Sequence, residues 1–422
     1  MPESPEHTSK PARVDGPHWL TRERVVLVCS ALVLSLDLTA LGSRIWAAYV
    51  SKLPATALGY DFTVFWSASY VTMHSGALSA YDPSVIEHVV LSLLHRPPTE
   101  FGTPWVYPPT FLLLVWPFSL WPFLASYLAF VVIGIAFAGF VCSRILMQKL
   151  TGVFWLPALA FPSVWIAVMA GQNSFFTLGV AGLGLTLLDR RPWLAGVCIG
   201  LLAIKPQFGI VFPLVLLLGR QWRVIAAATI TVAALCLAAG IAFGFDTFGE
   251  FFDSLSLFGH FIVERSAHWP GGIASAFGAA RSLGLSPAQG YLIHAAFAVP
   301  AVLLAAYLSA IKARLALRAA AIGLATIVAQ PYLLGYDLVW LALPILFLMV
   351  DGRRHGWLRW DVPVLVAAWL APLIFSLMGP PVVIVFLALM VMLIRRNGVR
   401  LTTSAEVVKH HTQAVMSPDA NS

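Results

Sequence analysis

Long apolar segments recur along almost the whole chain, with short polar connections between them. A membrane-spanning α-helix needs roughly 20 consecutive, mostly apolar residues. The strands of a membrane β-barrel would instead alternate apolar and polar residues over short segments, and the sequence lacks that alternation. Only 11% of the 422 residues are charged, too few to cover the surface of a water-soluble protein of this size. We therefore expect an all-α polytopic membrane protein.

The apolar segments predict about twelve transmembrane helices. Segment 107–145 is too long for a single crossing, and the prolines in its first half break helices. We therefore expect 107–121 to be a kinked or re-entrant piece that precedes a crossing. The expected crossings are 25–47, 123–145, 153–170, 174–188, 193–206, 207–219, 223–243, 289–309, 317–331, 337–350, 361–377 and 381–394.

The crossings define one transmembrane domain over residues 25–396, with two long loops at about 48–106 and 244–288. Residues 1–24 and 397–422 are expected to be disordered tails. No signal peptide is apparent, because the first apolar run is long enough to span a membrane. Inside the first loop, 84–95 has an apolar helical face, which predicts an amphipathic helix lying on the membrane. The alternative is an ordinary helix that covers the bundle.

The basic residues predict the orientation of the chain. If the N-terminus is cytoplasmic and the chain crosses twelve times, twenty of the 26 Lys and Arg residues fall on the cytoplasmic side. Both termini are then cytoplasmic, and the two long loops, where we expect the chemistry, are external. The net charge of +7 thus reflects membrane orientation and gives no reason to expect a nucleic-acid partner. The six remaining basic residues are Arg44, Lys52, Arg96, Lys205, Arg265 and Arg281.

A carboxylate flanked by aromatic residues follows the first crossing, in the string Gly59 to Trp66. Aromatic rings can hold the faces of a sugar, and a carboxylate can accept the proton of a sugar hydroxyl. Asp61 is therefore a candidate general base, with Tyr60 and Trp66 as candidate sugar contacts. The alternative is that Asp61 caps a helix that begins at Phe62.

Lys205 lies near membrane depth in an apolar stretch, where a charge is costly and indicates function. It could pair with a phosphate at the lipid headgroups, or it could extend its ammonium group to the interface. Tyr107 begins a Tyr-Pro-Pro string whose irregular backbone is expected to border the site. The turn amides of Gln172 and Asn173 could bond a ligand hydroxyl or cap the next helix.

The second loop carries Arg265, His268 and Trp269, which could bind a phosphosugar or form a plain surface loop. At another external turn, Asp337 follows Tyr336 and could instead be an N-cap. We include Tyr336, Asp337 and Gln207, which follows Lys205-Pro206, among the candidate sugar or acceptor contacts. No acidic cluster, Walker motif, Rossmann fingerprint or HExxH string is present, so we expect no metal and no cofactor.

Taken together in this order, the strings resemble glycosyltransferase family 87, whose members are polytopic GT-C-type enzymes. The strings are Asp-Phe-x-x-Phe-Trp at 61, Tyr-Asp-Pro at 81, Tyr-Pro-Pro at 107, Gly-Gln-Asn at 171, Lys-Pro-Gln at 205 and Pro-Tyr-x-x-x-Tyr-Asp at 331. The resemblance covers roughly residues 25–395. The best-known members are α-mannosyltransferases that use polyprenyl-phosphate mannose.

The resemblance implies a GT-C-like bundle in a bacterial-type inner membrane, a polyprenyl-phosphate sugar donor and a catalytic aspartate that maps onto Asp61. It implies transfer of a sugar, mannose by analogy, to a glycan or glycolipid hydroxyl on the non-cytoplasmic face. One carboxylate suffices for a displacement with inversion, and Lys205, Arg265 and His268 are candidates to hold the donor phosphate. The alternative function is a secondary transporter or a flippase for lipid-linked sugars, although no internal repeat is obvious.

Overall fold

The computed structural model describes residues 22–50, 58–94, 104–147, 152–265, 272–378 and 381–415. Within these ranges the chain is helical, and its one piece of extended pairing is an isolated bridge between Ile273 and Leu334. The expectation of an all-α protein is therefore confirmed for the described residues.

Within the described part of the chain, five helical segments are long and apolar enough to cross a membrane. They are α1 (Arg22–Ile45), α5 (Phe123–Leu146), α11 (Trp222–Phe243), α14 (Pro287–Ala310), and η8 (Gly335–Leu341) continued by α16 (Ala342–His355). Many of their apolar side chains face outward: Ile241 on α11 and Leu292 on α14 are each 74% exposed. Exposed apolar surface on this scale suits contact with lipid, as expected for a multi-pass membrane protein.

The expected count of about twelve crossings is not confirmed, because several segments are shorter than a bilayer crossing requires. Proline is the cause at two of them. Segment 153–170 is broken at Phe161-Pro162 into two short helices, and the stretch around Lys205-Pro206 passes through two 3₁₀ turns. The shorter elements are α4 (Pro109–Val115), α6 (Gly152–Leu159), α7 (Pro162–Ala170), α8 (Ser174–Leu187), α9 (Pro192–Gly200), η5 (Leu201–Ile204), η6 (Pro206–Phe208), α10 (Phe212–Leu218), α15 (Leu315–Val328) and α17 (Asp361–Met378).

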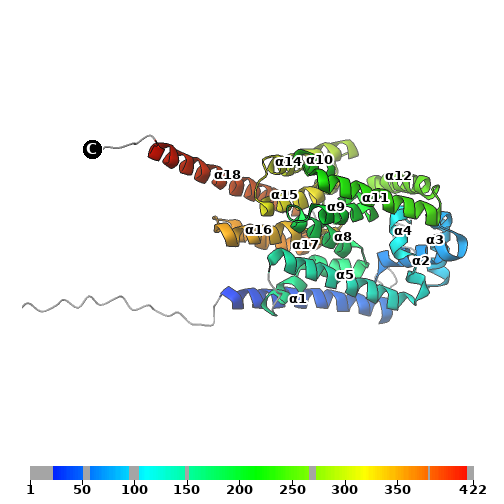
Figure 1. Ribbon diagram of the computed structural model, residues 1–422. Helices are drawn as coiled ribbons and strands as arrows, with labels where there is room; N and C mark the ends of the chain where they lie inside the picture. Colours follow the sequence, from blue (N-terminus) through cyan, green and yellow to red (C-terminus); the bar gives the residue numbers. More distant parts are fainter. Residues whose placement is uncertain are drawn as a thin grey trace, which may run out of the picture.

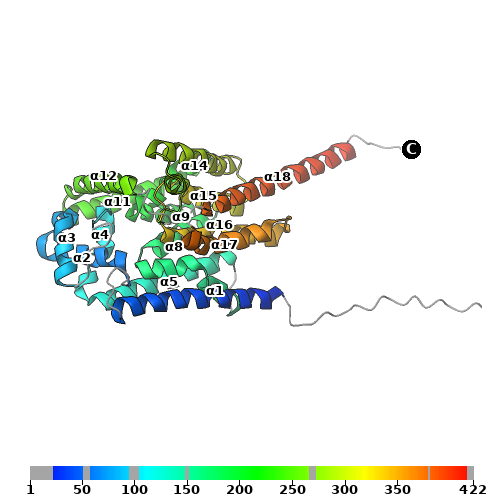
Figure 2. The ribbon, with the colours of Figure 1, turned by 180° about the vertical axis from the view of Figure 1, so that it is seen from behind.

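The bundle has two distinct ends. Figures 1 and 2 show α2 (Tyr60–Ser75), α3 (Pro83–Ser92) and α4 together at one end, which we call the site end. The beginning of α1 and the C-terminal half of α18 (Val382–Val415) lie toward the opposite end, which we call the far end. α18 continues as a helix through much of the segment 397–422 that we expected to be a tail.

The first long loop folds into α2, η3 (Leu78–Tyr81) and α3, which share a core with α4 and α5. Ile86, Val89 and Val90 of α3 are buried in that core. The apolar face of α3 therefore packs on protein, which makes α3 a covering helix and corrects the expectation that 84–95 lies on the membrane. Asp82 caps α3 by accepting from the Ser84 backbone N–H at 2.9 Å, as the Asp-Pro string indicated.

The second long loop contains α12 (Thr247–Arg265) and α13 (Ala276–Ser282). Its residues before α13 are fixed to the chain that precedes η8. The Ala274 backbone N–H donates to the Leu333 carbonyl at 2.6 Å, and the Ser275 hydroxyl donates to the Pro331 carbonyl. These hydrogen bonds hold this part of the loop against the chain segment that leads into Tyr336 and Asp337.

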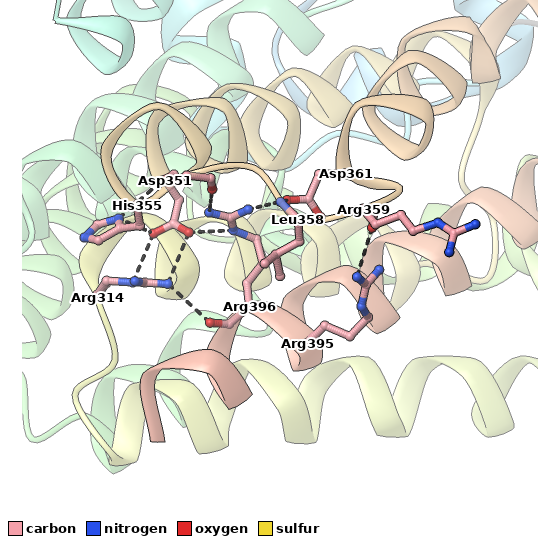
Figure 3. A network of polar contacts seen from close by, with 9 residues as sticks. Arg314, Asp351, His355, Leu358, Arg359, Asp361, Arg395 and Arg396 are labelled. Carbon is pink, nitrogen blue, oxygen red and sulfur yellow. Dashed lines mark hydrogen bonds and ion pairs between the residues drawn. The ribbon is translucent and has the colours of Figure 1, made fainter. Parts of the chain in front are cut away.

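A buried ion network ties the far end together (Figure 3). Asp351 of α16 receives the guanidinium of Arg396 from α18 at 2.6 Å and that of Arg314, which precedes α15, at 3.0 Å. Arg396 also pairs with Asp361 at the start of α17. Because Asp351, Asp361 and Arg396 are all buried, each charge needs these partners, and the network fixes the relative positions of α16, α17 and α18.

Two glycines allow the segment before α2 to approach the turn before α8. Gly59 and Gly171 both have φ of +69°, and the Gly59 N–H donates to the Met169 carbonyl at 2.8 Å. A Cβ on Gly171 would lie 2.6 Å from the Phe62 Cβ, and a Cβ on Gly59 would lie 2.9 Å from the Tyr127 ring. Only glycine fits both the left-handed backbone and this close packing.

We expect Gly171→Ala to lower the free energy of unfolding by roughly 2–4 kcal/mol, because it adds left-handed strain to a steric clash. Thermal unfolding in detergent measures the loss. Gly244→Ala, at φ of +90° with open space around it, isolates the strain, and Gly42→Ala has neither problem. Equal stability of all three variants would contradict the packing argument.

Candidate functional site

Asp61 lies in the first turn of α2, at the site end, and does not cap that helix. The N-cap is Gly59, and no side chain caps the helix. The Asp61 carboxylate instead accepts a hydrogen bond of 2.7 Å from the Gln172 side-chain amide, from the turn between α7 and α8. Asp61 itself is half-buried. The capping alternative is therefore wrong, and the carboxylate faces a turn more than 100 residues along the chain.

Gln172 also joins Asp61 to Tyr107. Its side-chain amide lies 2.9 Å from the Tyr107 hydroxyl, which in turn lies 3.1 Å from the Gln172 side-chain oxygen. Burial, followed by the negative charge of Asp61, raises the pKa of the Tyr107 phenol, so that the hydroxyl keeps its proton. The structure thus brings together three predicted residues from three separate strings.

Lys205 and Asp337 form a buried ion pair beside this group. The Lys205 ammonium lies 2.8 Å from the Asp337 carboxylate, and the two side chains are only 4% and 7% exposed. The Ser174 hydroxyl donates to the same carboxylate oxygen at 2.7 Å. Lys205 therefore does not extend to the interface, and the N-cap of η8 is Leu334 rather than Asp337, so both of these alternatives are wrong.

The pKa of Asp61 reports how these groups act on it. Burial raises this pKa to about 6, against the opposing effects of the hydrogen bond from Gln172 and the positive charge of Lys205. The negative charge of Asp337 raises it further, and the Tyr336 hydroxyl lowers it. A carboxyl group with this pKa is largely ionised near neutral pH and is still basic enough to accept a proton.

The remaining predicted residues lie at different depths. Tyr336 is half-buried, with its ring centroid 5.3 Å from the Lys205 ammonium, and Tyr60 is half-buried next to Asp61. Asn173 is fully buried, and no described residue offers its side-chain amide a hydrogen bond.

Two of the predicted sugar contacts, Trp66 and Gln207, lie differently from the rest. Trp66 packs in the core of α2 and α5, and its indole N–H donates to the Trp121 carbonyl at 3.0 Å. The Gln207 side chain is exposed, and its backbone carbonyl accepts from Gln330 at 2.6 Å. His268 and Trp269 lie outside the described residues, as does the side chain of Arg265.

The sequence did not indicate two contributors to the site. Ser174 stood next to Asn173 in the turn string, but nothing in the string pointed to Asp337 as its partner. The Phe208 ring is the second contributor, and its centroid lies 4.9 Å from the Lys205 ammonium. The same ring stacks on the Trp340 ring, with 4.7 Å between the two centroids. Among the described residues, no three His, Cys, Asp or Glu side chains gather in a group that could hold a metal ion.

Comparisons with known proteins agree on one family. The sequence model of glycosyltransferase family 87 matches residues 105–334, more than half of the chain. The chain is also similar to proteins named α-(1→3)-arabinofuranosyltransferase from two strains of Mycobacterium tuberculosis, CDC 1551 / Oshkosh and ATCC 25618 / H37Rv. The identity is 34% over 152 residues, so the match spans about a third of the length of these relatives (34%) and 32% of this chain. No solved structure matches the chain.

We expect Lys205→Met to lower the free energy of unfolding by about 3–5 kcal/mol, because it leaves the buried Asp337 carboxylate without its cation. The double variant Lys205→Met/Asp337→Leu should recover most of this loss, because no unpaired charge remains. Thermal unfolding in detergent compares them, with Arg144→Met as a control at an exposed cation. If the double variant is no more stable than Lys205→Met, the unpaired Asp337 carboxylate is not the cause of the lost stability.

Proposed function

Given that this chain belongs to glycosyltransferase family 87 and is a membrane glycosyltransferase, we propose that it transfers a sugar from a polyprenyl-phosphate donor to a hydroxyl of a glycan or glycolipid acceptor. The reaction takes place at the site end, with Asp61 as the general base. The observation that carries the proposal is the half-buried Asp61 carboxylate, held by Gln172 next to the Lys205–Asp337 pair.

In this mechanism the acceptor hydroxyl oxygen attacks the anomeric carbon of the sugar. The bond between that carbon and the phosphate oxygen breaks, the polyprenyl phosphate leaves with the electron pair, and the hydroxyl proton passes to Asp61. This single displacement inverts the anomeric centre, so a β-linked donor would give an α-linked product. The neighbouring carboxylate, Asp337, is engaged by Lys205 and Ser174, which supports inversion over a covalent intermediate on a second carboxylate.

Lys205 remains the candidate partner of the donor phosphate. An ammonium group has three N–H donors, and the Asp337 carboxylate takes one of them at 2.8 Å. The others can reach a phosphate oxygen and offset the charge that develops on the leaving group. The buried Asn173 amide, unpartnered among described residues, supports a polar ligand at the same wall, because buried polar groups normally have partners. Arg265 and His268 stay candidates from the adjoining loop.

The sugar is either mannose or arabinofuranose. Mannose follows from the general resemblance to family 87, whereas the similar M. tuberculosis proteins are named for arabinofuranose. We propose a donor with either sugar on the same lipid phosphate, because the Asp61 and Lys205 chemistry acts on the hydroxyl and the phosphate, which both donors share.

We further propose that the site end is external and that both termini are cytoplasmic. The helix ends at the far end carry most of the basic residues, including the cluster around Arg396 and those at the turns before α11 and α15. Basic residues concentrate on the cytoplasmic side of membrane proteins. This orientation gives the site access to a lipid-linked donor in the outer leaflet.

We expect Asp61→Asn to lower the rate of sugar transfer by about 10²–10⁴-fold, because the amide cannot accept the hydroxyl proton. Purified protein is incubated with polyprenyl-phosphate mannose and, separately, with polyprenyl-phosphate arabinofuranose, together with membrane lipid extract, and new glycoside is measured. Asp82→Asn is the matched control, because it changes an exposed carboxylate in the same loop to a residue that can still cap α3. A parent-like rate in Asp61→Asn would move the base to another residue, and no glycoside from either donor would argue against the proposed reaction.

The transfer rate should rise with pH through about 6, as Asp61 loses its proton. Gln172→Met should move this rise to higher pH, because the hydrogen bond it removes favours the charged carboxylate. The pH dependence of kcat/KM for parent and variant measures the shift, and Gln207→Met, which removes an exposed amide, should leave the profile in place. If kcat/KM of Gln172→Met rises at the same pH as that of the parent, a group other than Asp61 determines the pH dependence.

A further inference from the structure

The far end contains a cavity of about 430 Å³ that is lined by basic side chains. Its volume falls in the range of roughly 300–1,000 Å³ that is typical of small-molecule sites. It lies where α8 ends, whereas the candidate active site lies where α8 begins, so the length of this helix, roughly 20 Å, separates the two. The charged residues of its lining are Arg220, Lys312, Arg314, Arg318 and Asp189.

Two of the four cations have acidic partners among the described residues, and the other two have none there. Arg318 pairs with Asp189, and Arg314 belongs to the Asp351 network of Figure 3. Arg220 and Lys312 are exposed, and among the described residues neither has an acidic partner. The cavity therefore keeps a net positive charge after all of these ion pairs are counted.

The backbone of the two unpaired cations sets them apart as well. Arg220 has φ of 54° and Lys312 has φ of 50°, each just beyond the C-terminal end of a helix, α10 and α14 respectively. Glycine is the usual residue in this left-handed position. The chain places a long basic side chain there in both turns, and both side chains line the same cavity.

Two helices also begin at the cavity. α11 starts after Gln221 and α15 starts after Arg314, and neither N-terminus is capped by a side chain. The free backbone N–H groups and the positive end of the helix dipole at such a terminus favour an anion, and phosphate groups are common ligands there. Unpaired cations and uncapped helix N-termini thus favour the same kind of ligand.

We propose that this cavity binds a phosphate-bearing anion, with Arg220 and Lys312 as its principal contacts. The site is separate from the reaction at Asp61 and does not depend on the proposed mechanism. The phosphate belongs to the headgroup of an anionic phospholipid or to a soluble phosphate compound, because the far end lies at a boundary between the membrane and water.

The test uses the full-length protein purified in detergent. Native mass spectrometry measures retention of phosphatidic acid, phosphatidylglycerol and phosphatidylcholine, and a parallel arm titrates inorganic pyrophosphate by thermal shift. The variants are Arg220→Gln/Lys312→Gln and Arg220→Gly/Lys312→Gly. The matched control is Arg144→Gln/Arg353→Gln, which removes two exposed cations outside the cavity lining.

Both cavity variants should weaken binding roughly fivefold or more, since each lost ion contact is partly exposed. Added salt should weaken binding to the parent protein. The glycine variant should keep or raise the unfolding temperature because it relieves the left-handed strain, which separates lost binding from lost folding.

A loss confined to the lipids assigns the site to a headgroup, and a loss confined to pyrophosphate assigns it to a soluble compound. Absence of binding to the parent, or an equal loss in the control variant, would overturn the proposal.

Discussion

The buried ion pair between Lys205 and Asp337 is the interaction on which the site depends. Moving two charges out of water costs several kcal/mol for each ion, and only close contact and further hydrogen bonds offset this cost. Here the contact is 2.8 Å, Ser174 donates to the carboxylate, and the rings of Phe208 and Tyr336 lie next to the ammonium. Lys205 lies between two 3₁₀ turns and Asp337 lies within a third, so the α-helical backbone is interrupted at both residues. Irregular backbone in a membrane protein is tolerated where it is buried or lines a cavity, and both side chains of this pair are buried.

The pair also affects how readily the Asp61 carboxylate accepts a proton. If Lys205 paired directly with Asp61, the cation would stabilise the charged carboxylate and make it a weak base. Because Asp337 takes that contact, the positive and negative charges act on Asp61 in opposite directions, and burial remains the largest influence on its pKa. The hydrogen bond from Gln172 is then the largest of the influences that lower this pKa. Asp337 thus affects the Asp61 pKa in two ways, because its own charge raises that pKa and because it takes the close contact of Lys205.

The sequence predicted the positions of most helices, because apolar length and proline placement are local properties. It also predicted the residues around Asp61, since aromatic and amide residues beside apolar segments stood out against a background of low charge. It could not predict that Gln172 would bond Asp61 or that Lys205 would select Asp337, since those partners are 111 and 132 residues apart and nothing local encodes the pairing. The alternatives for Asp61 and Asp337 failed for the same reason, because N-capping is a local interaction and tertiary partners displaced it. The face of α3 was misjudged because an apolar helical face reads alike whether lipid or protein covers it.

Charge serves different purposes at the two ends of the bundle. At the site end, the buried cation Lys205 is balanced by the Asp337 carboxylate, so this ion pair adds no net charge to the site. In the proposed reaction, the leaving phosphate develops charge and can bind the remaining N–H donors of Lys205 without a large rearrangement. At the far end, the buried charges of Asp351, Asp361 and Arg396 are paired in a fixed network, while the exposed Arg220 and Lys312 stay unpaired among the described residues. The unpaired cations of the far-end cavity suit an anion that stays bound. The Lys205–Asp337 pair, whose charges balance, suits a leaving group that forms and departs in each turnover.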